Sequence, residues 1–254
     1  MRRRVRVSIA SLGQLPADRL IPAGDLVLLV DGCWSTFKNR LWVLYDMALK
    51  PVGSDIAYFL DPYLRCGREN ALGWQAALAT IRGDILERVK ALVSDGLPGF
   101  ATIAREYGWV HQYCHWHLIC ALQRQLGWHR RYPPDPWLRN TIYRTLREVL
   151  VIRDGPRLEA LCCQLRELIG QHNCTRQLRR IVGEFLRRRD DFRAYLRYPD
   201  LKLPRTTCTV ESMHRLLRQA IGTANNPNSL LARAKAFIRL HPTCTCNSSA
   251  FAQI

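Results

Sequence analysis

The stretch Leu26-Val27-Leu28-Leu29-Val30-Asp31-Gly32 decides the fold, because it is an unbroken apolar run that ends in a carboxylate and a glycine. A second stretch, Val89-Lys90-Ala91-Leu92-Val93-Ser94-Asp95-Gly96, has the same pattern. A short apolar run bounded by a turn signal is typical of a buried strand. We therefore expect two buried strands, each of which delivers an aspartate at its C-terminal end before the glycine turns the chain.

Three more segments, 41–48, 56–60 and 109–113, are rich in the aromatic and β-branched residues that favour strands. Apolar residues at helical spacing predict helices over 70–88 and 97–107. Strands joined by a tight turn pair antiparallel, whereas a helical crossover returns a strand parallel to the sheet. The sequence therefore predicts an α/β fold with a mixed five-stranded sheet flanked by helices, and its first and fourth strands lie side by side.

The pattern changes to helix over residues 118–204, where Leu138, Ile142, Leu146 and Leu150 recur at i, i+4 spacing. Residues 121–200 hold 17 arginines and no lysine against nine acidic residues. We expect a basic, all-helical insertion within the core. The predicted organisation is a basic lead-in over 1–24, the first part of the core over 25–117, the insertion over 118–204, a second core part over 205–240 and a tail over 241–254.

The chain carries a formal net charge of +17, and 33 of its 38 basic residues are arginines. The planar guanidinium group of arginine can donate two hydrogen bonds to phosphate oxygens, and so large a basic excess is typical of nucleic-acid binding. No apolar run approaches the ~18 residues of a membrane span. Ten scattered cysteines without a secretory signal indicate reduced thiols. We expect a cytoplasmic, nucleoid-associated protein that binds DNA and no membrane.

Three acidic residues are candidates for a metal site. Ligands of open α/β sheets bind at the C-terminal ends of the strands, where Asp31 and Asp95 are expected. Glu211 falls in the first turn of an expected helix that Thr206-Thr207-Cys208-Thr209 opens. Carboxylates suit two Mg²⁺ (or Mn²⁺) ions, which together cleave phosphodiesters. Asp31 would bridge the two ions, with Asp95 on one and Glu211 on the other.

The ordered set of motifs around these residues is similar to the catalytic domain of Mutator-type transposases and their bacterial insertion-sequence relatives. The set comprises Val30-Asp31-Gly32, Ser94-Asp95-Gly96, Tyr113-Cys114-His115-Trp116-His117-Leu118 and Thr206 to Arg218. The resemblance covers residues 25–240. It implies an RNase-H-like fold, a DDE triad of Asp31, Asp95 and Glu211, and an accessory role for Cys114 and His117.

The activity that this resemblance implies is metal-dependent cleavage at transposon ends followed by strand transfer into target DNA, in a homodimer or a higher oligomer on DNA. Two alternatives stay open. The chain could be an RNase-H-like nuclease with the same triad, or a DNA-binding remnant of a transposase that no longer binds metal.

Glu211, Arg215 and Arg218 share a helical face at i, i+4 and i+7. The two arginines could bind DNA phosphates, or the face could be a solvated one with salt bridges.

Cys114 and His117 have two other interpretations besides an accessory role: they could be a packing pair, or half of a zinc site. Other ligands of such a zinc site would come from Cys120, His111, His241, Cys244 and Cys246. Asp46 is expected at a strand edge or behind the metal ligands, and Asp61 in a turn.

Overall fold

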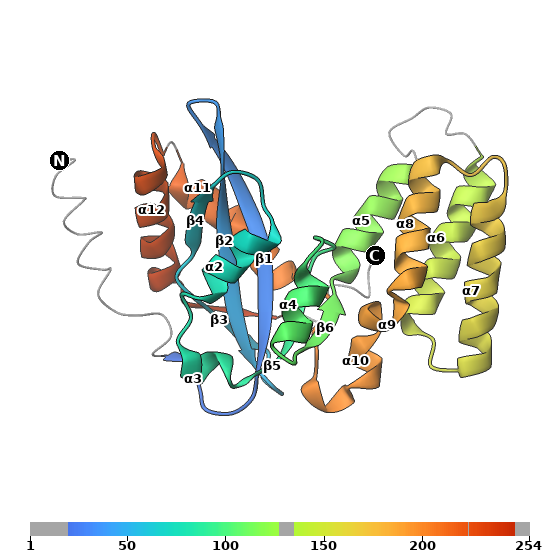
Figure 1. Ribbon diagram of the computed structural model, residues 1–254, viewed down its shortest axis with the longest axis horizontal. Coiled ribbons are helices and arrows are strands. Elements are labelled where there is room, and N and C mark those ends of the chain that lie inside the picture. Colours follow the sequence, from blue (N-terminus) through green and yellow to red (C-terminus); the bar gives the residue numbers. More distant parts are fainter. Residues whose placement is uncertain (1–19, 127–134, 223, 247–254) are drawn as a thin grey trace.

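The computed structural model describes residues 20–126, 135–222 and 224–246, and the structural statements below refer to these ranges (Figure 1). Its strands are β1 (Leu26–Phe37), β2 (Arg40–Pro51), β3 (Ile56–Phe59), β4 (Tyr63–Cys66), β5 (Val89–Ser94), β6 (Val110–Tyr113) and β7 (Thr243–Thr245). Its helices are α2 (Ala71–Leu78), α3 (Gly83–Leu86), α4 (Phe100–Glu106), α5 (His115–Leu126), α6 (Pro136–Val151), α7 (Gly155–Gly170), α8 (Arg176–Arg187), α9 (Arg189–Phe192), α10 (Ala194–Arg197), α11 (Cys208–Ile221) and α12 (Pro227–Leu240).

The described strands form one mixed, open seven-stranded sheet in the order β6-β5-β1-β2-β3-β7, with β4 paired to β2. β1 pairs antiparallel with β2 and parallel with β5, and β5 pairs parallel with β6. The predicted α/β class and the parallel pairing of the first and fourth predicted strands are confirmed. The predicted number of five strands was wrong: β4 and β7, of four and three residues, are too short to show a strand period in the sequence.

β1 does not end at Asp31 as predicted. It continues to Phe37 and pairs residue by residue with β2, so Gly32 lies inside the strand opposite Tyr45. The chain turns instead at Lys38 and Asn39, both of which have positive φ angles, as a two-residue hairpin turn requires. The glycine at position 32 leaves room for Glu69, since a Cβ atom there would meet the Glu69 carboxylate at 2.6 Å.

Helices cover both faces of the sheet (Figure 1). Side chains of α2 and α4, including Trp74 and Phe100, pack against one face of β1, β2 and β5. Val210 and Met213 of α11 pack against the other face. The single helix predicted over 70–88 is divided into α2 and α3, because the backbone is extended at Arg82, with a ψ angle of 142°.

Between β6 and α11, the described chain is helical apart from its connecting turns, as predicted for residues 118–204. Helices α5 to α8 share a second core, in which Ile142, Leu165 and Phe185 are fully buried. These helices lie beyond the β6 edge of the sheet (Figure 1), and α9 and α10 contact β6 itself.

The predicted end segments fall partly outside the described residues: 1–19 of the lead-in, 127–134 of the insertion and 247–254 of the tail. The described part of the tail includes β7, which pairs with β3 and so belongs to the sheet. No helix in the described ranges combines the length and the apolar character that a membrane crossing requires.

Candidate metal and catalytic site

Asp31 and Asp95 lie at the same level of two neighbouring parallel strands. The last paired residues of β1 and β5 are Leu29 and Val93, and each aspartate follows two positions later. Side chains two positions apart on a strand point to the same face. Leu29 packs toward α11, so Asp31, two positions further along the same strand, faces that helix. Asp95 follows the end of β5, and its carboxylate accepts a hydrogen bond from the Leu97 backbone N–H at 3.0 Å. Asp95 directly follows β5 as predicted, whereas Asp31 lies within β1.

Glu211 lies in the first turn of α11, which packs across β1 and β2. Burial raises the pKa of Asp31 to about 7, and the negative charges of Glu211 and Asp95 add to this rise. Burial also raises the pKa of Glu211, and the negative charge of Asp95 raises it further. The fold therefore brings the three predicted acids close enough for their charges to interact, although up to 180 positions separate them in the chain.

His214 joins this group and was not singled out from the sequence. Its Nδ1 lies 3.4 Å from Asp31 Oδ2, and its Nε2 lies 2.7 Å from Asp46 Oδ2. Asp46 is the direct cross-strand partner of Asp31 and is only 1% exposed. Burial lowers the pKa of His214, but the charges of Asp46 and Asp31 outweigh this effect and raise it overall. Asp46 therefore contacts His214, which in turn contacts Asp31, and this agrees with its expected place behind the metal ligands.

The spacing of Glu211 and His214 is a signal that could have found the histidine. Residues three apart on a helix share a face, so a residue at i+3 from an acid that faces the sheet also faces the sheet. A histidine at such a position can lie against the carboxylates that the acid approaches.

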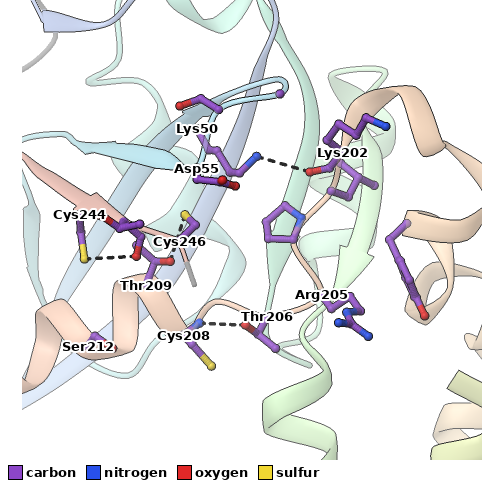
Figure 2. Close-up of a pocket in the computed structure, with 16 residues that line it drawn as sticks. Lys50, Asp55, Lys202, Arg205, Thr206, Cys208, Thr209, Ser212, Cys244 and Cys246 are labelled. Carbon is purple, nitrogen blue, oxygen red and sulfur yellow. Dashed lines mark hydrogen bonds between the residues drawn. The ribbon is translucent and has the colours of Figure 1, made fainter. Parts of the chain in front are cut away.

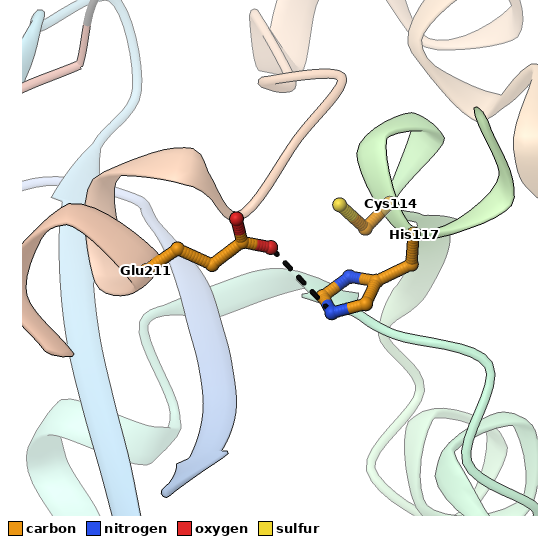
Figure 3. Close-up of side chains that lie close together, drawn as sticks. All are labelled: Cys114, His117 and Glu211. Carbon is orange, nitrogen blue, oxygen red and sulfur yellow. Dashed lines mark ion pairs between the residues drawn. The ribbon is translucent and has the colours of Figure 1, made fainter. Parts of the chain in front are cut away.

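Cys114 and His117 flank Glu211 from the start of α5 (Figure 3). His117 Nε2 lies 3.5 Å from Glu211 Oε1. The Cys114 sulfur accepts hydrogen bonds from the backbone N–H and the hydroxyl of Thr207, both at 3.3 Å. Burial raises the pKa of the Cys114 thiol to about 12, which makes it a neutral thiol at physiological pH. The predicted pair is therefore adjacent to the third acid.

The two predicted arginines occupy different positions. The guanidinium of Arg218 hydrogen-bonds the Cys33 thiol, and the charge of Asp31 helps to raise the pKa of Arg218. Arg215 is exposed on the outer surface of α11. Both arginines are exposed, and Arg218 is the one whose charge interacts with that of Asp31.

Glu69 is a fourth acid near the site that sequence reasoning missed. Its carboxylate lies next to Gly32 and accepts hydrogen bonds from the indole N–H groups of Trp74, at 2.9 Å, and Trp34, at 3.2 Å. Burial raises the pKa of Glu69, and the charge of Asp95 raises it further. No local pattern marks this glutamate, since it lies in the connection between β4 and α2.

The other zinc ligands considered from the sequence do not gather with Cys114 and His117. Among the described residues, the group able to share one ion consists of Cys114, His117 and Glu211. His111 Nε2 instead lies 2.8 Å from the Ser94 hydroxyl, and the Cys246 sulfur accepts a hydrogen bond from the Thr209 hydroxyl.

Asp61, expected in a turn, lies between β3 and β4 and forms an ion pair with Arg239.

A cavity of about 580 Å³ opens beside the start of α11 (Figure 2). Lys50, Lys202 and Arg205 supply positive charge to its lining, and Asp55 supplies negative charge. The buried Lys50 ammonium donates to the Lys202 carbonyl at 3.4 Å, and burial lowers the pKa of this lysine. Cys208, Thr209 and Ser212 of α11 line the cavity, whereas Glu211 and His214 of the same helix approach the aspartates.

Comparison of the sequence with protein-family models gives no matching family, and comparison with curated proteins gives no match.

Proposed function

We propose that this chain is the catalytic core of a DDE-type DNA transposase with an RNase-H-like fold. The main support is the strand register: Asp31 and Asp95 each lie two residues after the last paired residues of the parallel strands β1 and β5. Glu211, in the first turn of α11, is near enough for its charge to act on Asp31. The sheet supports this proposal, because an antiparallel β1–β2–β3 unit followed by parallel β5 and β6 is the arrangement that places such acids together. The net charge of +17 favours a phosphodiester substrate.

The three carboxylates are the ligand type that a hard divalent cation prefers. Mg²⁺ and Mn²⁺ prefer oxygen ligands, and three carboxylates supply them. Burying several carboxylates together is costly, as the raised pKa values of Asp31 and Glu211 indicate, and a cation would offset that cost. Asp31, Asp95 and Glu211 would hold two ions, which would activate the attacking oxygen and neutralise charge on the leaving oxygen.

The remaining side chains of the site would orient these acids and the DNA. One ring nitrogen of His214 contacts the Asp31 carboxylate, and the other contacts Asp46. His117 contacts Glu211 and is partly exposed, so it can also reach a phosphate group in the site. Arg218 and the exposed Arg215 would contact the DNA backbone on either side of the scissile bond. Cleavage and joining at two transposon ends would need a homodimer or a higher oligomer on DNA.

The substitution Asp31→Asn tests this proposal because it removes one ionisable carboxylate and keeps the shape of the side chain. We expect nicking of supercoiled DNA in Mg²⁺ or Mn²⁺ to fall at least about 1,000-fold, since metal-assisted stabilisation of the transition state is worth several kcal/mol. DNA binding, measured by fluorescence anisotropy, should persist. Asp84→Ala, at an exposed acid of α3, is the control and should nick DNA like the wild type.

The same assay distinguishes the alternatives. Wild-type protein that binds DNA but shows no nicking with either ion would contradict the proposal and indicate a DNA-binding remnant. Cleavage without any joining of the freed 3′ ends to a second duplex would indicate a nuclease with the same triad.

A further inference from the structure

Three side chains with different ligand atoms converge between α5 and α11: the Cys114 thiol, the His117 imidazole and the Glu211 carboxylate (Figure 3). We propose that they form a binding site for a thiophilic divalent cation of the zinc class, distinct in its donor set from the carboxylate site for Mg²⁺. Because Glu211 belongs to both donor sets, an ion held here would withdraw Glu211 from Asp31 and Asp95.

The spacing of the three ligand atoms suits one small ion. All three lie within 4.8 Å of one another. Zinc bonds of about 2.0–2.3 Å in a tetrahedron bring ligand atoms to somewhat less than about 4 Å apart. Small side-chain rotations therefore suffice, and His117 and Glu211 have room for them because both are partly exposed.

Two atoms of the cluster lack a hydrogen-bond partner although they are buried. These are His117 Nδ1 and Glu211 Oε1, whose contact with His117 Nε2 is an ion pair at 3.5 Å rather than a hydrogen bond. A buried polar atom without a partner costs free energy, and a bound cation would satisfy these atoms.

The Cys114 sulfur accepts two hydrogen bonds, from the backbone N–H and the hydroxyl of Thr207. Burial keeps this group a neutral thiol in the metal-free protein, so a bound cation would have to displace its proton. Donors aimed at sulfur stabilise negative charge on it, and such outer contacts orient metal ligands. A core cysteine that packs only as a small apolar residue has no need of two such donors.

The donor types select the class of ion. Sulfur and imidazole nitrogen suit zinc, whereas Mg²⁺ takes oxygen ligands. Three protein ligands leave the fourth tetrahedral position open to water or to a phosphate oxygen. Binding of the ion rests only on these contacts. Inhibition of DNA cleavage by the ion, through loss of Glu211 from the triad, rests in addition on the proposed function.

Cobalt(II) is the probe, because it replaces zinc and reports a bound thiolate by a sulfur-to-metal charge-transfer absorption. Full-length protein stripped with EDTA and kept reduced should bind one equivalent, with that absorption and intense visible bands of tetrahedral cobalt, and Zn²⁺ should displace it. Cys114→Ser should lose the charge-transfer absorption and bind at least about 10-fold more weakly, since even outer contacts are worth that much at metal sites.

Two further variants make the test independent of a folding defect in Cys114→Ser. His117→Gln, at a partly exposed position, should keep the charge-transfer absorption with affinity reduced at least about 10-fold. Cys208→Ser removes a neighbouring half-buried thiol on α11 and should leave the spectrum unchanged. A wild-type spectrum without the charge-transfer absorption, its persistence in Cys114→Ser, or its loss in Cys208→Ser would overturn the site.

Asp31→Asn separates this inference from the proposed function. It should retain the cobalt spectrum in full while DNA nicking is lost. If wild-type nicking is observed, Zn²⁺ should inhibit it, and Cys114→Ser should relieve that inhibition at least about 10-fold. Equal inhibition of both proteins would overturn the competition for Glu211.

Discussion

Asp31 lies against His214 rather than open to solvent, and this contact determines how the buried charges of the site balance. The His214 imidazole lies between Asp31 and the almost fully buried Asp46, so its protonated form offsets the charge of both carboxylates. Breaking a buried pair leaves the remaining charge without compensation, which costs more than the pair itself contributes. His214 is therefore expected to support the local structure as well as the position of Asp31.

His214→Ala should lower the free energy of unfolding by about 3–5 kcal/mol, because it leaves the Asp46 carboxylate buried without its partner. The double variant His214→Ala, Asp46→Ala removes both groups and should lose at least about 0.5 kcal/mol less than the sum of the two single variants. Urea denaturation without divalent ions measures all four proteins. Additive losses would show that the two side chains are energetically independent.

At the scale of elements, the sheet and the helices beyond its β6 edge are joined through α5. His115, the first residue of α5, is fully buried and its Nε2 lies 2.6 Å from the Phe192 carbonyl of α9. Burial lowers the pKa of His115 to about 4, and the charges of Arg205 and Arg193 act in the same direction. The neutral imidazole of His115 thus donates a hydrogen bond to the Phe192 carbonyl, and protonation of this imidazole would destabilise the folded state.

This pKa predicts an acid-labile junction. The ordinary pKa is 6.5, so between pH 6.5 and about 4 the unfolded chain binds a proton at His115 that the folded chain does not. The contribution of His115 is therefore complete above pH 6.5 and is lost as pH falls toward 4, to an extent of roughly 3 kcal/mol.

His115→Gln keeps an N–H donor for the Phe192 carbonyl but removes the titrating group. We expect the free energy of unfolding to fall less steeply between pH 6.5 and 4 in this variant than in the wild type, as measured by urea denaturation at several pH values. His111, whose pKa burial also lowers to about 4, remains in both proteins and gives both curves a shared slope. Parallel curves would contradict the prediction.

At the scale of the whole molecule, the net charge of +17 dominates any encounter with DNA. Each neutralised phosphate releases counterions, so affinity falls steeply with salt. If the chain covers about 6–10 phosphates, its affinity for a duplex should fall about 10³- to 10⁵-fold between about 50 and 200 mM salt.

Arg215→Gln should reduce the slope of log affinity against log salt by about 1, because one phosphate contact is lost. Arg82→Gln is the matched control, since Arg82 pairs with Asp84 on α3, away from the α11 surface. Fluorescence anisotropy at several salt concentrations gives both slopes. A wild-type slope near zero, or equal slopes for the two variants, would contradict DNA contact through α11.

The sequence by itself determined the local elements and much of the candidate site. Apolar runs and i, i+4 spacing depend on nearby residues, so the five main strands and the helices between β6 and α11 could be predicted from composition and period alone. Asp31, Asp95 and Glu211 could be selected because two of them follow matching apolar runs and the third opens a helix. In the structure the three acids are close enough for their charges to interact, and the metal triad stays a prediction.

Only the tertiary structure decided where β1 ends and which residues surround the acids. The Lys38–Asn39 turn and twelve cross-strand pairs carry β1 past Gly32, although an Asp-Gly pair by itself indicates a turn. Asp46, Glu69 and His214 join the site through contacts between residues distant in the chain. The contacts of His214 form only when α11 packs on the sheet, and those of Glu69 only when the β4–α2 connection folds against β1. The spacing from Glu211 could therefore suggest His214, but no local pattern shows which side chains these residues meet.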